Sequence, residues 1–191
     1  MAAPRREEST RERLLQAAAS LISEDVDQNV SVREICGHAG VQLPTLYHYF
    51  QSKRGLIDAV TAYGSDELTR AMTAAAEAIP DDVGRRVGAA CDAHVEYGLT
   101  HPSFYVLMYG RVAPGRRAPG WEGPAELLAR LLAPAEAAGA LAVTSEVAVE
   151  HILATLTGLV LHLISKGDAD PRLARAMRDA ARYAILAAEG V

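Results

Sequence analysis

The sequence predicts an all-α protein. Half of its 191 residues are hydrophobic, Ala, Leu, Arg and Glu are abundant, and runs of β-branched residues are few; this composition favours helices. Apolar residues recur at helical spacing along most of the chain, and Gly or Pro separates the segments. We expect an N-terminal three-helix helix-turn-helix domain over residues 1–54, followed by a six-helix domain over residues 55–191.

The chain begins with a charged segment and a first amphipathic helix. Residues 1–8 are rich in charge, and we expect them to be disordered. The first helix is predicted over residues 10–24. Its core face consists of Leu14, Ala18, Leu21 and Ile22.

A capping box predicts where the second helix begins. Ser31 is followed three residues later by Glu34, so the helix should start at Val32. Gly40 supplies the residue that can turn with positive φ after the helix end. The apolar face of this helix is Val32, Ile35, Cys36 and Ala39.

The third helix carries the most informative surface of the chain. Pro44 fits its first turn, where a missing N–H costs nothing. Leu46 and Phe50 lie four residues apart and should face inward. The helix should therefore turn Thr45, Tyr47, His48 and Tyr49 outward. Tyrosine offers a hydroxyl and an apolar ring, which suit phosphates and base edges, so this helix is predicted to enter the major groove of DNA.

These residues resemble the TetR (tetracycline-repressor-like) family of bacterial regulators. The resemblance implies a dimeric, ligand-responsive transcriptional repressor that binds a palindromic operator and is released by a small organic effector. It is specific for the first quarter to third of the chain and only architectural beyond. Gln42 departs from the family pattern, which usually has a small hydroxyl residue as helix cap. The matching residues are Ile35, Ala39, Gly40, Val41, Thr45, Leu46, Tyr47, His48, Tyr49, Phe50, Lys53 and Leu56.

Ten residues are predicted to contact DNA. Lys53 should hold a phosphate at the start of the fourth helix, and Ser31 and Arg33 are candidates for others. Residues 1–54 hold as many acids as cations, whereas a DNA-binding domain is typically more basic. Two alternatives therefore stay open: a Tyr-His-Tyr triplet packed in the core, or a helix-turn-helix without DNA binding. The predicted contacts are Ser31, Arg33, Gln42, Leu43, Pro44, Thr45, Tyr47, His48, Tyr49 and Lys53.

Six further helices follow from periodicity, capping residues and breakers. Pro80 ends a long fourth helix, and Asp170 with Pro171 caps the ninth. The segment 111–123 is rich in Pro, Gly and Arg and is predicted to be a mobile loop. The helices are expected at about 55–79, 83–100, 102–110, 124–138, 145–166 and 171–188.

The last two helices are predicted to form a dimer interface. The eighth has a broad apolar face for the protein's own core and a second face formed by His151, Thr155, Gly158 and His162. In the resembled family the two C-terminal helices form a four-helix bundle with their copies, and a dimer places two recognition helices about 34–36 Å apart. The alternative is that this helix is buried all round in a monomer.

The middle helices are predicted to form a ligand pocket. Much of the chain's small supply of aromatic residues gathers there, and apolar walls with a few hydroxyl and imidazole groups suit an uncharged or weakly polar organic molecule. For any single residue the alternative is ordinary core packing. The candidates are Cys91, His94, Tyr97, Tyr105, Met108, Tyr109, Trp121 and Thr155.

Other function classes have little support. No phosphate loop or nucleophile motif is present, so we expect no enzyme, cofactor or catalytic residue. Cys91 and His94 lack the further ligands of a metal site, and His151 lies about 16 Å from His162 along the helix. No apolar run is long enough to span a membrane; the segment 147–164 comes closest, but polar residues interrupt it. Cys36 and Cys91 suit a reduced, cytoplasmic protein. The alternative function is a helical small-molecule-binding protein that does not regulate through DNA.

Overall fold

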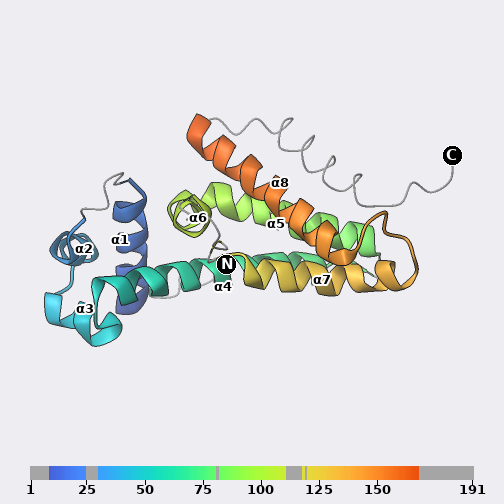
Figure 1. Ribbon diagram of the computed structural model, residues 1–191. Coiled ribbons are helices and arrows are strands. Elements are labelled where there is room, and N and C mark those ends of the chain that lie inside the picture. Colours follow the sequence, from blue (N-terminus) through green and yellow to red (C-terminus); the bar gives the residue numbers. More distant parts are fainter. Residues whose placement is uncertain (1–8, 25–29, 81, 111–117, 119, 168–191) are drawn as a thin grey trace, which may run out of the picture.

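The computed structural model describes residues 9–24, 30–80, 82–110, 118 and 120–167, and its secondary structure there is eight α-helices (Figure 1). The predicted all-α class is therefore confirmed. Three predictions lie outside the described residues: the disorder at 1–8, the ninth helix at 171–188, and most of the loop at 111–123.

Three short helices form the N-terminal head. They are α1 (Thr10–Glu24), α2 (Val32–Ala39) and α3 (Leu43–Phe50). The bounds of α1 and the start of α2 agree with the sequence-based expectation. Leu14 and Leu15 of α1 are fully buried in the head core. The other core side chains of these helices are Ala17, Ala18, Ala19, Ile22, Ile35, Cys36, Ala39, Leu46 and Phe50.

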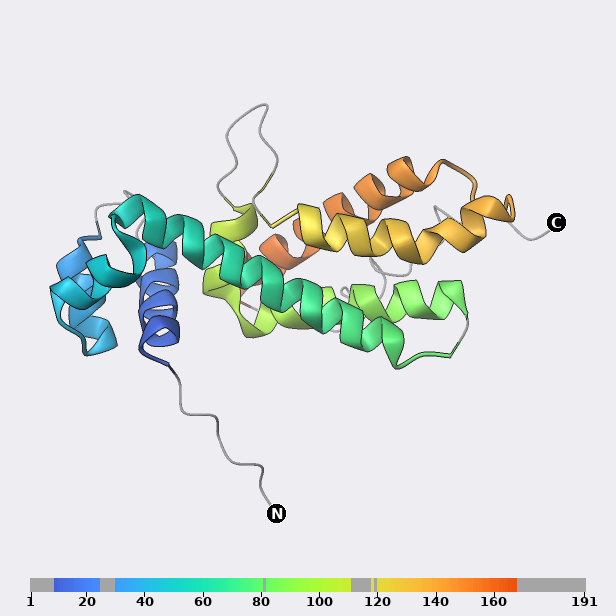
Figure 2. The ribbon, with the colours of Figure 1, turned by 90° about the horizontal axis from the view of Figure 1, so that it is seen from below.

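Helix α4 (Lys53–Glu77) belongs to both halves of the molecule. Ser52 caps it by accepting a hydrogen bond from the Gly55 N–H, so it begins two residues before the predicted start at residue 55. Leu56 and Val60 complete the head core, whereas its later side chains enter the body core. The predicted domain boundary at residue 54 thus falls inside the first turn of α4. Figures 1 and 2 show this helix running from the head along the body.

Four further helices form the body with α4. They are α5 (Val83–Thr100), α6 (Pro102–Tyr109), α7 (Glu122–Ala137) and α8 (Ser145–Lys166). Helices α4, α5 and α7 pack on one another, and α8 lies across α5 and α7. Helix α7 starts two residues before the predicted residue 124 and contains Pro134 near its end.

Helix α6 joins the body to the head. It packs against α1 as well as α4, α5 and α8. Its Phe104 side chain is buried in the head core, with its ring centroid 5.6 Å from that of Tyr63 on α4. A movement of α6 therefore has to be accommodated by α1, because packed cores are not continuously deformable.

Helix α8 is apolar and long enough to cross a membrane. It has 22 residues, and its most apolar window of 18 residues has a mean hydropathy of 1.8, so the expectation that no apolar run is long enough to span a membrane is wrong as regards length and composition. The polar residues that interrupt it are too few to lower its mean hydropathy sufficiently. Within the described residues, 44% of this 18-residue window is buried inside the protein. The core helix of a soluble protein meets the same criteria of length and hydropathy.

Candidate functional site

The turn between α2 and α3 has the predicted geometry. The Ser31 N–H donates to Glu34 Oε2 at 2.7 Å, and the Glu34 N–H donates to Ser31 Oγ at 3.2 Å, which completes the capping box. Gly40 adopts φ 65° and ψ 39°, the left-handed conformation that glycine accommodates without strain. The Val41 N–H then bonds the Cys36 carbonyl at 3.0 Å. These bonds fix the direction in which α3 leaves the turn.

Helix α3 presents a polar and aromatic face to solvent. Leu46 and Phe50 are buried in the head core, whereas Tyr47 and Tyr49 are each 44% exposed and His48 is exposed between them. The His48 and Tyr49 rings meet edge-on with centroids 5.4 Å apart. The alternative of a core-packed Tyr-His-Tyr triplet is therefore excluded.

The first turn of α3 adds further exposed groups. Gln42 occupies the N-cap position, with φ −83° and ψ 148°, but its side chain makes no capping hydrogen bond. Glutamine is a poorer helix cap than a small hydroxyl residue, and the exposed amide is available for another partner. Pro44 is exposed, and Leu43 and Thr45 are half-buried beside it.

A strained turn joins α3 to α4. Gln51 has φ 60° and ψ −31°, and the Ser52 N–H bonds the Phe50 carbonyl at 2.6 Å across it, as in a γ-turn. A Cβ atom on Gly55 would lie 2.3 Å from the same Phe50 oxygen, so only glycine fits there. A non-glycine residue at such φ costs of the order of 1–3 kcal/mol and marks a constrained site. The turn packs the start of α4 against the end of α3. Lys53, the first residue of α4, is half-buried there.

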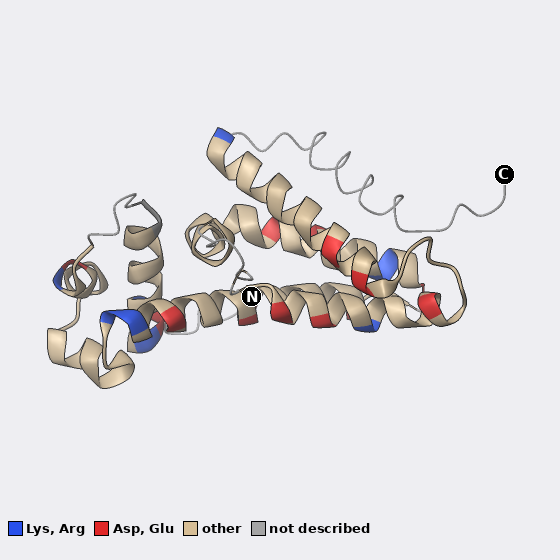
Figure 3. Ribbon diagram, viewed as in Figure 1, with Lys and Arg blue, Asp and Glu red and all other residues tan. Residues whose placement is uncertain are grey.

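The charges of the head differ from those of the body. Figure 3 shows Lys and Arg at the start of α4 and on α1 and α2, whereas Asp and Glu are spread along the body helices. Arg33 is exposed on α2, and Ser31, the remaining predicted phosphate contact, is half-buried at its N-cap. The Arg11 guanidinium lies 5.7 Å from the centre of the Phe50 ring, a cation–π contact between α1 and α3.

Most of the predicted ligand residues meet in the body core. Cys91, Tyr97, Tyr105, Met108 and Tyr109 are buried in one cluster, and the half-buried Trp121 packs against it. His94 is fully buried with its ring against Tyr105 and Tyr109. Thr155 lies apart, half-buried toward the outer face of α8.

The polar groups of this cluster are mostly bonded to one another. His94 Nε2 lies 2.7 Å from the Tyr105 hydroxyl, and the Tyr109 hydroxyl donates to the Gly120 carbonyl at 2.6 Å. Among the described residues, none provides a hydrogen-bond partner for the buried His94 Nδ1. Burial lowers the pKa of His94 to about 3, so its imidazole is neutral at neutral pH. Burial also raises the pKa of Tyr97, Tyr105 and Tyr109.

Sequence reasoning missed two features of the body. Thr157, not Thr155, approaches Tyr105, where its hydroxyl opposes the burial-driven rise in the tyrosine pKa. Its spacing from Leu153 and Val160 places it on the core face and could have revealed it. The second feature is a cavity between α4, α5 and α7, which the sequence alone does not reveal because it depends on how three helices meet.

The predicted dimer residues share the outer face of α8. His151, Gly158 and His162 are exposed, with the half-buried Thr155 beside them. A Cβ atom on Gly158 would have nothing within 4 Å. The face is therefore open in one subunit and includes a position without a side chain.

Residues 14–60 match the sequence model of the family described as "Bacterial regulatory proteins, tetR family". The chain has a TetR-family N-terminal domain. The match begins inside α1 and runs through α2, α3 and the first turns of α4, which supply the head core together with Phe104 of α6. No curated protein sequence matches the chain significantly.

Solved structures with this fold match nearly the whole chain. A protein of unknown function from Rhodococcus sp. RHA1 is 26% identical, with a TM-score of 0.72 over 97% of this chain and 100% of its own. The fatty acid degradation regulator FadR from Bacillus halodurans is 17% identical, with a TM-score of 0.80 over 97% of this chain and 98% of its own. A putative tetR family transcription regulator from Shewanella sp. PV-4 is 17% identical, with a TM-score of 0.77 over 94% and 99%. The fold shared with these structures therefore includes both the head and the body.

Proposed function

We propose that this protein is a dimeric, ligand-responsive transcriptional repressor that works in the cytoplasm and binds a palindromic operator through α3. The observation that supports this most strongly is the outer face of α3. Its Tyr47, His48 and Tyr49 side chains are exposed and contribute little to the head core. A recognition helix needs such donors, acceptors and apolar edges to contact bases and phosphates in the major groove.

Selection of bound duplexes from a random DNA pool at moderate salt tests this proposal. A motif with two-fold symmetry and half-sites about one helical turn apart is the expected result. If no motif emerges and all binding disappears with added salt, then DNA binding is non-specific at most. The alternative of a helical small-molecule-binding protein that does not act through DNA would then be preferred.

Lys53→Ala should weaken binding to every DNA sequence by a similar factor. Lys53 is proposed to contact a phosphate, so its loss should reduce the slope of log K against log salt by about one. Fluorescence anisotropy at several salt concentrations, on the selected site and on a random duplex, measures that slope. Lys166→Ala, at the end of α8 in the body, is the matched control and should leave the slope unchanged. An unchanged slope for Lys53→Ala would remove this residue from the interface.

The outer face of α8 is the proposed dimer interface. It combines the open position at Gly158 with the exposed His151 and His162 side chains. A glycine on an exposed helix face lowers the stability of that helix by about 1 kcal/mol relative to alanine. It also lets a second helix approach closely, which offsets this cost in a dimer.

Gly158→Arg should convert the dimer to a monomer without unfolding the subunit. The arginine fits one subunit, because nothing lies within 4 Å of the added Cβ, but two such side chains would meet across a two-fold axis. Light scattering after size-exclusion chromatography measures the mass, and circular dichroism measures the helix content. Ala129→Arg, at an exposed position on α7, adds the same charge elsewhere and should remain dimeric. A dimeric Gly158→Arg protein would place the interface elsewhere.

The effector is proposed to bind in the body near the cluster of His94, Tyr105 and Tyr109. The cluster offers a buried His94 Nδ1 that lacks a hydrogen-bond partner among the described residues. Tyr105 and Tyr109 lie on α6, whose Phe104 enters the head core. An effector that binds the DNA-incompetent arrangement of α6 more tightly must weaken DNA binding, and DNA must weaken effector binding by the same factor.

A further inference from the structure

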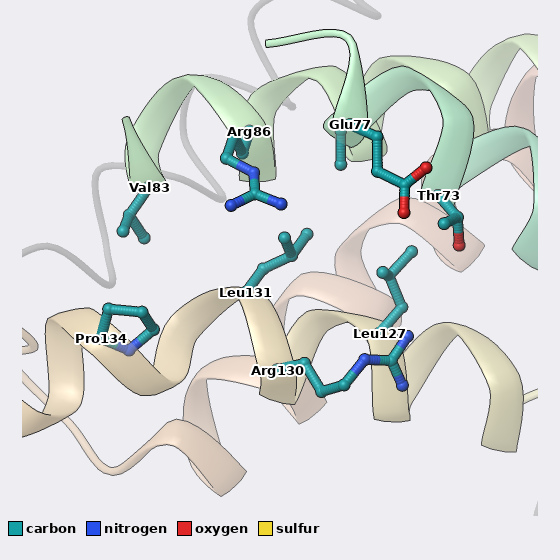
Figure 4. A pocket seen from close by; sticks show the side chains of 9 residues that line it. Thr73, Glu77, Val83, Arg86, Leu127, Arg130, Leu131 and Pro134 are labelled. Atoms are coloured by element: carbon teal, nitrogen blue, oxygen red, sulfur yellow. The ribbon is translucent and has the colours of Figure 1, made fainter. Parts of the chain in front are cut away.

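A cavity of about 160 Å³ lies between the far half of α4, the start of α5 and α7. It contains none of the residues predicted to bind a ligand. Figure 4 shows Arg86 reaching from α5 toward Leu131 of α7. Glu77 of α4 lies at the top of the same view, to the right of Arg86. The full lining is Thr73, Ala76, Glu77, Val83, Arg86, Leu127, Arg130, Leu131 and Pro134.

The two arginines of the cavity have no anionic partner among the described residues. Neither the Arg86 nor the Arg130 guanidinium forms an ion pair there, and the buried Arg86 Nε has no hydrogen-bond partner. A buried guanidinium N–H without a partner is costly, since the group loses water and gains nothing in exchange. An acceptor supplied from outside the chain would remove that cost.

The charges of the lining limit what such an acceptor can be. Arg86 and Arg130 outnumber the single carboxylate, Glu77, by one positive charge. A monoanion neutralises this excess, whereas a more highly charged group would exceed it and would be repelled more strongly by Glu77. The planar guanidinium matches a carboxylate, to which it donates two parallel hydrogen bonds.

The other walls indicate that the ligand also has an apolar part. Val83 of α5 and Leu127, Leu131 and Pro134 of α7 are the large apolar residues that line the cavity (Figure 4). Its volume is below the roughly 300–1,000 Å³ of pockets for drug-sized ligands. It suits a small acid, or the carboxylate end of a longer one that extends through the opening.

We propose that this cavity binds a small organic monocarboxylate, with its carboxylate on Arg86, its apolar part on Leu127 and Leu131, and the exposed Arg130 adding a second positive charge to the lining. A ligand there contacts α4, whose other end completes the head core through Leu56. Binding at this cavity therefore changes the affinity for DNA. This coupling rests on the proposed function, whereas the carboxylate site itself does not.

Titration calorimetry on the full chain tests the site directly. The probes are the straight-chain carboxylates from acetate to octanoate, with hexanamide as the neutral analogue of hexanoate. Saturable binding that tightens with chain length is expected, and hexanamide should bind at least tenfold more weakly than hexanoate. If none of the carboxylates saturates a site, the proposal is wrong.

Three substitutions locate the binding. Arg86→Gln should weaken hexanoate binding about tenfold or more, and Arg130→Gln should weaken it less, because Arg130 is exposed and its charge is screened by solvent; Arg85→Gln, an exposed neighbour outside the cavity, should leave it unchanged. Glu77→Gln removes the repelling carboxylate and should tighten binding several-fold, a gain that misfolding cannot produce. Unchanged affinity in both cavity arginine variants would place the ligand elsewhere and overturn the proposal.

The coupling to DNA has a separate readout. Anisotropy on the selected duplex should show a change in DNA affinity with hexanoate in the unmodified protein and not in Arg86→Gln. Binding of hexanoate without any effect on DNA affinity would overturn the coupling and leave the carboxylate site supported. Failure of the protein to bind DNA at all would count against the proposed function and not against the site.

Discussion

Gly98→Ala should lower the free energy of unfolding by about 1–3 kcal/mol, although alanine is the better helix former. Gly98 lies inside α5, where α6 and α8 converge. A Cβ atom there would lie 2.4 Å from Val160 Cγ1 and 2.9 Å from Tyr105 Cδ2. Val160 and Tyr105 are both fully buried, so neither can move without disturbing other core contacts. Urea unfolding followed by circular dichroism gives the difference.

Gly37→Ala is the matched control. Gly37 also lies inside a helix, α2, but a Cβ atom there would have nothing within 4 Å. The same substitution should therefore raise the free energy of unfolding by about 0.5–1 kcal/mol, because only the backbone entropy and helix propensity change. Because the two changes in the free energy of unfolding have opposite signs, they separate the effect of core packing from that of helix propensity. If Gly98→Ala were also stabilising, α5 and α8 would not be as close as the structure has them.

The head could be predicted from the sequence in detail because its signals are local. The capping box of Ser31 and Glu34, the turn at Gly40 and the inward pair of Leu46 and Phe50 each act within four residues. Together they fixed the bounds of α2 and α3 and the exposure of the α3 face. The strained residue Gln51 gave no such signal, since its φ depends on how α3 and α4 are packed.

The body was predictable as helices but not as a site. Periodicity located α5 and α8, yet it did not say which side chains of different helices would meet. Thr155 was chosen and Thr157 was missed because the orientation of α8 over Tyr105 is a tertiary property. The Arg86 cavity was missed for the same reason, since its walls come from three helices that are distant in the sequence.

Mild acid should destabilise the protein through His94. Its pKa is about 3 in the folded protein because of burial, against about 6.5 in an unfolded chain. Between these values the unfolded chain binds one more proton, so the free energy of unfolding falls as the pH falls. This residue alone should contribute a loss of about 2 kcal/mol between pH 7 and pH 5, at about 1.4 kcal/mol per full pH unit.

His94→Gln isolates this contribution. Glutamine keeps a polar group near the Tyr105 hydroxyl but does not titrate, so the variant should lose about 2 kcal/mol less than the unmodified protein between pH 7 and pH 5. His38→Gln, at an exposed position on α2, is the control and should follow the unmodified protein. Urea unfolding at both pH values and one fixed protein concentration makes the comparison, since the stability of a dimer depends on concentration. Equal losses in all three proteins would mean that folding does not lower the pKa of His94.

The same measurement bears on the effector. A histidine that stays neutral down to low pH gives the central cluster no positive charge, so it favours an uncharged or weakly polar ligand group. The excess positive charge of the described body pockets lies instead at Arg86 and Arg130. If the pH dependence traced to His94 is found, the proposed carboxylate is expected at the arginine cavity and an uncharged effector at the centre. If it is absent, His94 keeps an ordinary pKa and can be protonated in mild acid, so an acid is also expected to bind at the centre there.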